Sequence, residues 1–176
     1  FIHIGTAFSN IKSKQGFCEK LPSIYTEVEL IQLLNSIERT SVIRKRDYAI
    51  MALSVSYGLR ANDISSLKFS EISDGQLAFM QSKTSVMYQA DLLDKVSEAL
   101  RDYIQNGRPD SDCEYIFIRS SAPYRKLSRS SIWSIVCTYL MKSGINIGSR
   151  KRGSHAIRAS LATHLVNNDV PYYIVQ

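Results

Sequence analysis

The sequence is poor in the features that mark secreted, metal-binding or membrane-embedded proteins. Only three of its 176 residues are cysteine, at positions 18, 113 and 137, and no two of them form a C-x-x-C pair. This pattern predicts neither a disulfide framework nor a zinc site, and it favours a reducing, cytosolic setting. No apolar run approaches the roughly 20 residues that a membrane-spanning helix needs. We therefore expect no metal, no cofactor and no membrane partner.

The start of the chain also lacks expected signals. Residues 1–9 do not show the basic-then-apolar order of a signal peptide, and the first residue is Phe1 rather than methionine. We interpret the chain as a piece of a longer protein. Residues 1–22 show no periodicity and end in Leu21-Pro22, which predicts a linker or arm before one domain over residues 23–176.

Acidic residues are absent from residues 119–158, although the chain as a whole has a formal net charge of only +6. A basic region of this kind favours a polyanionic partner such as DNA, or it is simply a solvated face. In the preceding residues 91–114, seven charged residues are acidic and three are basic, so the positive charge is predicted to be concentrated on one part of the molecule. The basic residues of the region are Arg119, Arg125, Lys126, Arg129, Lys142, Arg150, Lys151, Arg152 and Arg158.

Apolar spacing predicts a mostly α fold with a small β-hairpin, an α+β class. A capping box at Thr26 and Glu29 predicts a first helix, and Gly58 is a natural end for a second, from Arg44 to Tyr57. Asn62 is predicted to cap a short third helix, and Asp91 or Asp94 to open a fourth that Gly107 closes. Residues 115–118 are predicted to be extended, and two further helices are expected over residues 128–143 and from the cap Ser154 to about Asn167. A hairpin is expected over residues 76–82 and 86–92, with Lys83 at its tip.

Three places could hold an anion. Arg60 lies on a predicted corner between two helices, where it could bind an anion, cap carbonyls or pair with Asp63. His155 and Arg158 are three residues apart on one helix face, near a positive helix N-terminus. Lys83 at a hairpin tip is, by itself, most often a solubilising residue. His164 has no charged neighbours in the sequence and is interpreted as a packed or capping histidine.

Taken in order, these segments resemble the catalytic domain of the tyrosine recombinase (phage integrase) family. The resemblance rests on Tyr57-Gly58-Leu59-Arg60 with Asp63-Ile64, on Gln81-Ser82-Lys83-Thr84, and on Ser154-His155-Ala156-Ile157-Arg158. It begins at about Leu21 and implies the tyrosine recombinase catalytic-domain fold, C-terminally incomplete, with residues 1–22 as the linker or arm from a missing N-terminal DNA-binding domain. It also implies site-specific DNA recombination through a 3′-phosphotyrosine intermediate.

The resemblance implies roles for individual residues. Arg60 and Arg158 would hold oxygens of the scissile phosphate, Lys83 would protonate the departing 5′ oxygen, and His155 would assist proton transfer. Asp63 would support the first arginine. Guanidinium groups suit this task because their forked donors fit phosphate oxygens. The DNA-binding residues are expected to be Arg125, Lys126, Arg129, Arg150, Lys151 and Arg152.

The resemblance places the nucleophilic tyrosine beyond Gln176, with Tyr172 and Tyr173 in the helix before it. The implied partners are double-stranded DNA and further copies of the protein, as a tetramer on DNA, in a prokaryotic cytoplasm. One alternative is a non-catalytic DNA-binding module that keeps the fold. A type IB topoisomerase would share the chemistry, but the compact spacing of the segments favours a recombinase. A basic helical protein-interaction domain is a third alternative.

Overall fold

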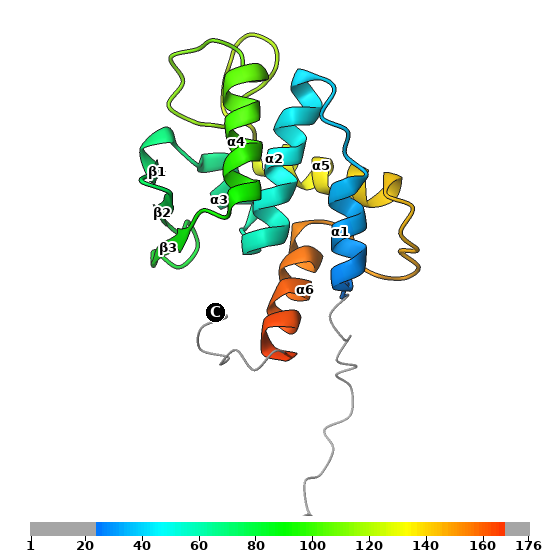
Figure 1. The fold of residues 1–176 in the computed structure, drawn as a ribbon. Helices are drawn as coiled ribbons and strands as arrows, with labels where there is room; N and C mark the ends of the chain where they lie inside the picture. Colours follow the sequence, from blue (N-terminus) through cyan, green and yellow to red (C-terminus); the bar gives the residue numbers. More distant parts are fainter. Residues whose placement is uncertain (1–23, 168–176) are drawn as a thin grey trace, which may run out of the picture.

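Helix α2 (Val42–Tyr57) is the element around which the other helices pack, and it lies near the centre of Figure 1. The computed structural model describes residues 24–167. Helices α1, α3, α4, α5 and α6 all contact α2. Their bounds are α1 (Glu27–Asn35), α3 (Ala61–Ser66), α4 (Asp94–Asn106), α5 (Arg129–Lys142) and α6 (Ser154–Asn167), with a short 3-10 helix η1 (Phe69–Glu71). The predicted mostly α fold is confirmed.

A three-stranded antiparallel sheet lies beside α3 and α4 (Figure 1). It consists of β1 (Ile72–Ser73), β2 (Gln76–Met80) and β3 (Met87–Asp91), in that order. In the hairpin, Gln76 faces Asp91 and Met80 faces Met87. The predicted hairpin with Lys83 in its turn is confirmed. Strand β1 could not be predicted from the sequence, because a two-residue strand is too short to show alternation.

Several helix ends follow local chemistry. Thr26 and Glu29 form the predicted capping box at the start of α1, and Ser128 caps α5. Gly58 ends α2 in the left-handed conformation, with φ 59° and ψ 30°, which a residue without a Cβ adopts at little cost.

Two predicted caps were wrong. Helix α3 begins at Ala61, so Arg60 rather than Asn62 is its N-cap residue, and no side chain caps it. Helix α6 begins at Ser154 itself, and the buried hydroxyl of that serine has no hydrogen-bond partner among the described residues. Neither predicted side chain therefore caps its helix, and most helical stability in proteins comes from tertiary packing.

The core consists of two hydrophobic clusters, and α2 contributes to both. Ile50 and Leu53 of α2 belong to the first cluster, with β2, α3 and α4. Met51, one position along, belongs to the second, with α1, α5 and α6. Burying a side chain of this size stabilises a fold by about 1.5–3 kcal/mol, so α2 joins the two halves of the domain. The other members include Ile64, Leu77, Phe79, Leu100, Tyr103, Phe117 and Ile132 in the first cluster, and Leu30, Leu33, Val136, Leu140, Ala156 and Ile157 in the second.

A buried carboxylate also links α2 to α5. Nε and Nη2 of Arg46 donate to Oδ1 of Asp47 at 3.0 and 2.9 Å, and the Tyr139 hydroxyl donates to Oδ2 at 3.3 Å. Burial raises the pKa of Asp47, and the charge of Arg46 opposes that rise. The donors around Asp47 therefore offset much of the cost of burying its charge.

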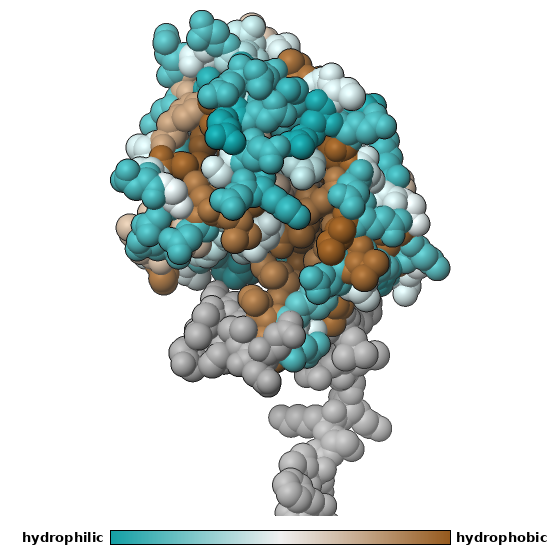
Figure 2. Space-filling model, viewed as in Figure 1, coloured by the Kyte–Doolittle hydropathy of each residue, from teal (hydrophilic) through white to brown (hydrophobic). Residues whose placement is uncertain are grey.

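The two parts of the face seen in Figure 2 differ in polarity. Hydrophilic residues cover α4, whose exposed side carries Asp94, Lys95 and Glu98. Apolar residues gather lower down, where α1 and α6 lie, and Val28 and Ile31 of α1 are among the exposed hydrophobic residues. None of the helices within residues 24–167 combines the length and apolar character needed to cross a membrane.

Candidate active site

The corner between α2 and α3 holds Arg60 in a defined position. Asp63 follows on the first turn of α3 and is 4% exposed, and its Oδ2 lies 3.8 Å from Nη1 of Arg60. The same Nη1 donates a 2.7 Å hydrogen bond to Oε1 of Gln81, at the base of the hairpin turn. The guanidinium is therefore held from two elements, and the predicted pairing of Arg60 with Asp63 is present.

Helix α6 brings Arg158 to the same corner. Its Nη1 donates a 2.8 Å hydrogen bond to the carbonyl oxygen of Gly58. Partial burial lowers the pKa of Arg158, and the nearby charge of Arg60 lowers it further. An arginine stays protonated in proteins, so the shift indicates two like charges close together in a partly dry site. Such a corner favours an anion with several oxygens.

The hairpin turn is attached to this corner through Ser82. Oδ1 of Asp63 accepts hydrogen bonds from the backbone N–H of Ser82 at 3.0 Å and from its hydroxyl at 2.5 Å. Lys83, the next residue, is exposed. The structure thus places the turn that carries Lys83 beside the residue that supports Arg60.

The two histidines on α6 lie in different surroundings. His155 is exposed on the first turn, three residues before Arg158. His164 lies in the last turn and is partly buried. Of the four predicted catalytic residues, the structure links Arg60 and Arg158 to one corner, holds Lys83 next to it, and leaves His155 at the exposed end of the helix that supplies Arg158.

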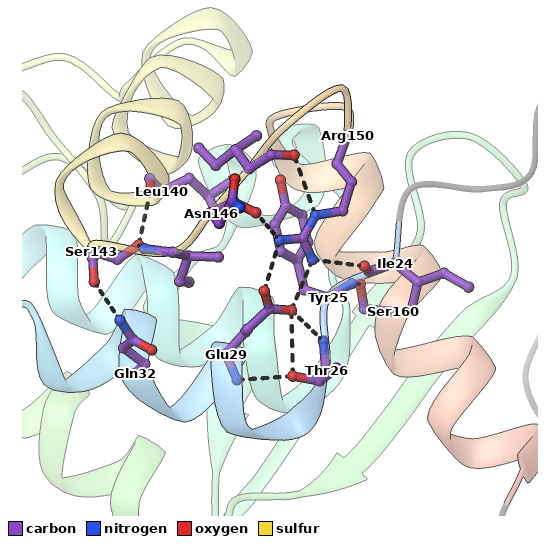
Figure 3. Close-up of polar contacts among 12 residues, drawn as sticks. Ile24, Tyr25, Thr26, Glu29, Gln32, Leu140, Ser143, Asn146, Arg150 and Ser160 are labelled. Atoms are coloured by element: carbon purple, nitrogen blue, oxygen red, sulfur yellow. Dashed lines mark hydrogen bonds and ion pairs between the residues drawn. The ribbon is translucent and has the colours of Figure 1, made fainter.

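Arg150 does not lie on an open basic surface. Figure 3 shows its guanidinium between the start of α1 and the loop before α6. It donates to both carboxylate oxygens of Glu29, at 2.8 and 2.7 Å, and to the backbone carbonyls of Ile24, Asn146 and Ile147. Its guanidinium carbon also lies 4.4 Å from the ring centroid of Tyr25. These contacts engage the donors of Arg150 inside the domain, so they disfavour the predicted contact of Arg150 with DNA.

The other basic residues that were expected to contact DNA are exposed. Nζ of Lys126 donates to Oγ of Ser66 at 3.2 Å and lies 4.8 Å from the ring centroid of Tyr115. A side-chain nitrogen of Arg152 contacts the sulfur of Met141 at 3.8 Å. The exposed set is Arg125, Lys126, Arg129, Lys151 and Arg152.

Four groups at the corner were not assigned a role from the sequence. They are the carbonyl oxygen of Gly58, the side chains of Gln81 and Ser82, and Tyr88 on β3. Burial, followed by the nearby Tyr57, raises the pKa of Tyr88 to about 12, while Arg158 opposes that rise. One signal in the sequence could have identified a role for Gln81: a side chain that can accept hydrogen bonds directly precedes Ser82-Lys83. Within residues 24–167 no three His, Cys, Asp or Glu side chains are grouped so that they could hold a metal ion.

The chain is similar to known proteins over nearly its whole described length. Residues 24–176 match the model of the phage integrase family. A putative integrase/recombinase of Sinorhizobium fredii is 33% identical over 88% of this chain and 81% of its own length. The tyrosine recombinase XerD of Pasteurella multocida is 27% identical over 96% of this chain. The chain spans 57% of that XerD, and only about a third of two further Sinorhizobium fredii relatives.

Solved structures share the fold. The XerA recombinase superposes with a TM-score of 0.73 at 22% identity, covering 88% of this chain and 54% of its own. The catalytic core of lambda integrase superposes with a TM-score of 0.65, also at 22% identity, covering 88% of each chain. At this identity the superpositions establish the fold alone.

Proposed function

The chain belongs to the phage integrase family, and from that premise we propose that it breaks and rejoins DNA as a site-specific tyrosine recombinase. The observation that carries the proposal is the convergence of Arg60 and Arg158 on one corner. A phosphodiester of DNA is the anion that the family reaction brings to such a corner.

The two arginines would hold the non-bridging oxygens of the scissile phosphate. Attack by a tyrosine hydroxyl increases the negative charge on these oxygens in the transition state, where charged donors already in place are most effective. Each charge-assisted hydrogen bond contributes about 1.5–3 kcal/mol. Asp63 would keep Arg60 in place from its buried position on α3.

Lys83 and His155 would handle protons. Lys83 would protonate the 5′ oxygen that leaves, while its exposed position in the hairpin turn lets it approach a bound duplex. His155 would assist proton transfer from the exposed first turn of α6. The nucleophilic tyrosine of this reaction is proposed to lie beyond Gln176. Tyr172 and Tyr173, interpreted as part of the helix before it, lie outside the described residues.

Double-stranded DNA is the proposed partner. The exposed residues Arg125, Lys126, Arg129, Lys151 and Arg152 would contact its phosphates, and Arg150 is left out of this set because of its internal contacts. Neighbours in the fold support the proposal: one is XerH bound to its difH substrate, and another is a lambda integrase tetramer bound to a Holliday junction. By analogy, we propose a tetramer on DNA for the whole protein, in a prokaryotic cytoplasm.

The test is the formation of a covalent protein–DNA adduct. The chain, extended through the expected tyrosine, is incubated with a nicked suicide substrate that traps the 3′-phosphotyrosine. Arg60→Ala and Arg158→Ala are each expected to slow adduct formation about 10²- to 10³-fold, the usual effect of removing one transition-state donor. Arg101→Ala is the matched control, because Arg101 is exposed on α4 in the acidic stretch and its loss should leave the rate unchanged.

Two outcomes would contradict the proposal. An adduct that both arginine substitutions leave undiminished would exclude this site. DNA binding without any adduct from the unsubstituted extended chain would instead favour the non-catalytic DNA-binding module.

A further inference from the structure

The turn between β2 and β3 is a closed unit. The backbone N–H of Gln81 donates to the carbonyl of Val86 at 3.0 Å, and the N–H of Ser85 donates to the carbonyl of Gln81 at 2.9 Å. Lys83 lies between these closing bonds and is exposed. The turn therefore has a fixed shape, but its orientation relative to the arginine corner depends on contacts made by its side chains.

Two sets of contacts fix that orientation, and both are made by the residues directly before Lys83. Ser82 is bound to Asp63 through its N–H and its hydroxyl. Oε1 of Gln81, the residue before Ser82, accepts hydrogen bonds from Nη1 of Arg60 at 2.7 Å and from the hydroxyl of Thr84, the residue after Lys83, at 2.9 Å. Ser82 is thereby tied directly to the α2–α3 corner and Thr84 is tied to it through Gln81, which is the residue that joins the turn to the arginine itself.

We propose that Gln81 is a positioning residue for Lys83: its side-chain carbonyl ties the turn to Arg60, so that the lysine reaches the phosphate that Arg60 holds. The role rests on the proposed function above and deepens it. A glutamine suits the place because one oxygen can accept two hydrogen bonds without adding negative charge beside a phosphate. Glutamate would keep both bonds but would compete with the phosphate for Arg60.

The chemical step shows how this role can be measured. The tyrosine hydroxyl passes its proton to His155 as its oxygen forms a bond to phosphorus, the bond from phosphorus to the 5′ oxygen breaks, and the 5′ oxygen takes a proton from the ammonium Nζ of Lys83. If sulfur replaces the 5′ oxygen, the leaving group is a thiolate, whose conjugate acid has a pKa near 8.5 by analogy with cysteine. A thiolate leaves without a proton, so a residue that serves only Lys83 becomes dispensable on the sulfur substrate.

The experiment compares adduct formation on ordinary and 5′-sulfur DNA by the extended chain and its variants. Gln81→Met keeps the side-chain volume but removes the acceptor. We expect it to slow cleavage of ordinary DNA about 10²-fold, the scale of a misplaced catalytic group. It should cleave 5′-sulfur DNA near the unsubstituted rate, because the buried Asp63 still holds Arg60. Lys83→Ala should show the same rescue. Arg60→Ala should stay slow on both substrates, because the phosphate charge that it stabilises is present in each.

The outcomes separate this role from the proposed function. If the unsubstituted protein cleaves and Gln81→Met is as slow on sulfur DNA as Arg60→Ala, Gln81 serves the arginine and the positioning role is overturned. An unchanged rate on ordinary DNA would overturn it as well. If the unsubstituted protein cleaves neither substrate, the proposed function itself fails.

A second variant guards against misfolding. Thr84→Val removes one donor to Gln81 but leaves the bond from Arg60 in place. We expect a smaller slowing on ordinary DNA than for Gln81→Met, again rescued by the sulfur substrate. Circular dichroism and thermal unfolding identify variants that fold. A folded Thr84→Val protein that is slow on both substrates would count against the positioning role.

Discussion

Nη1 of Arg158 donates a 2.8 Å hydrogen bond to the carbonyl oxygen of Gly58, a residue 100 positions earlier in the chain. Helix α6 approaches the end of α2 so closely that a Cβ added to Gly58 would lie 3.5 Å from Cγ of Arg158 and 3.1 Å from Cδ2 of Leu161. Gly58 therefore has two functions. It ends α2 at positive φ, and it leaves room for the helix that delivers the second arginine.

Replacing Gly58 with alanine should harm both stability and the site. The left-handed backbone costs an alanine about 1–2 kcal/mol, and the contact with Leu161 requires α6 or its side chains to shift. We expect urea unfolding to show a loss of about 1–3 kcal/mol, and adduct formation to slow more than this loss explains, because Arg158 moves.

Gly75 is the matched control for this prediction. Its φ is +74°, yet nothing lies within 4 Å of an added Cβ. Gly75→Ala should therefore show the backbone cost alone and keep the rate of adduct formation. Equal rates of adduct formation by Gly58→Ala and Gly75→Ala would show that the close approach of α6 to Gly58 does not determine the position of Arg158.

Features set by neighbouring residues could be predicted from the sequence. The capping box at Thr26, the end of α2 at Gly58 and the hairpin around Lys83 all depend on contacts within a few residues. Hydrophobic spacing and turn chemistry report such contacts directly. The family resemblance then supplied the pairing of Arg60 with Arg158, which no local pattern contains.

Features set by distant partners could not be predicted. Arg150 belongs to a basic cluster in the sequence, but its carboxylate partner Glu29 is 121 positions away. Gln81 and Arg60 are likewise 21 positions apart and on different elements. In both cases the charge or polarity of the residue was visible, while the choice between solvent, DNA and an internal partner depended on packing.

The internal position of Arg150 predicts that it serves stability rather than DNA binding. Arg150→Ala leaves Glu29 and several carbonyls without their donor, so we expect the free energy of unfolding to fall by about 2–3 kcal/mol. Arg152→Ala should leave stability nearly unchanged. In DNA-binding titrations across salt concentrations, Arg152→Ala should reduce the slope of log K against log salt by about 1, while folded Arg150→Ala keeps the slope. If Arg150→Ala instead reduces the slope and Arg152→Ala keeps it, Arg150 contacts DNA and this prediction is wrong.

The pairing of Arg150 with Glu29 also predicts how stability depends on pH. Hydrogen bonds from Arg150 lower the pKa of Glu29 from 4.5 to about 2. A carboxyl group whose pKa is lower in the folded state stabilises the fold fully above pH 4.5, and this contribution is lost as the pH falls from 4.5 toward 2.

Glu29→Gln removes the charge but keeps a residue that suits a capping box. We therefore expect the variant to be less stable than the unsubstituted chain near pH 7, with the difference shrinking as the pH falls to about 2. Urea unfolding at a series of pH values measures this difference. Glu38→Gln is the control, because the pair of Glu38 with Arg44 is exposed and contributes little. A Glu29→Gln difference that stays constant from pH 7 to pH 2 would show that the ion pair adds nothing beyond its hydrogen bonds.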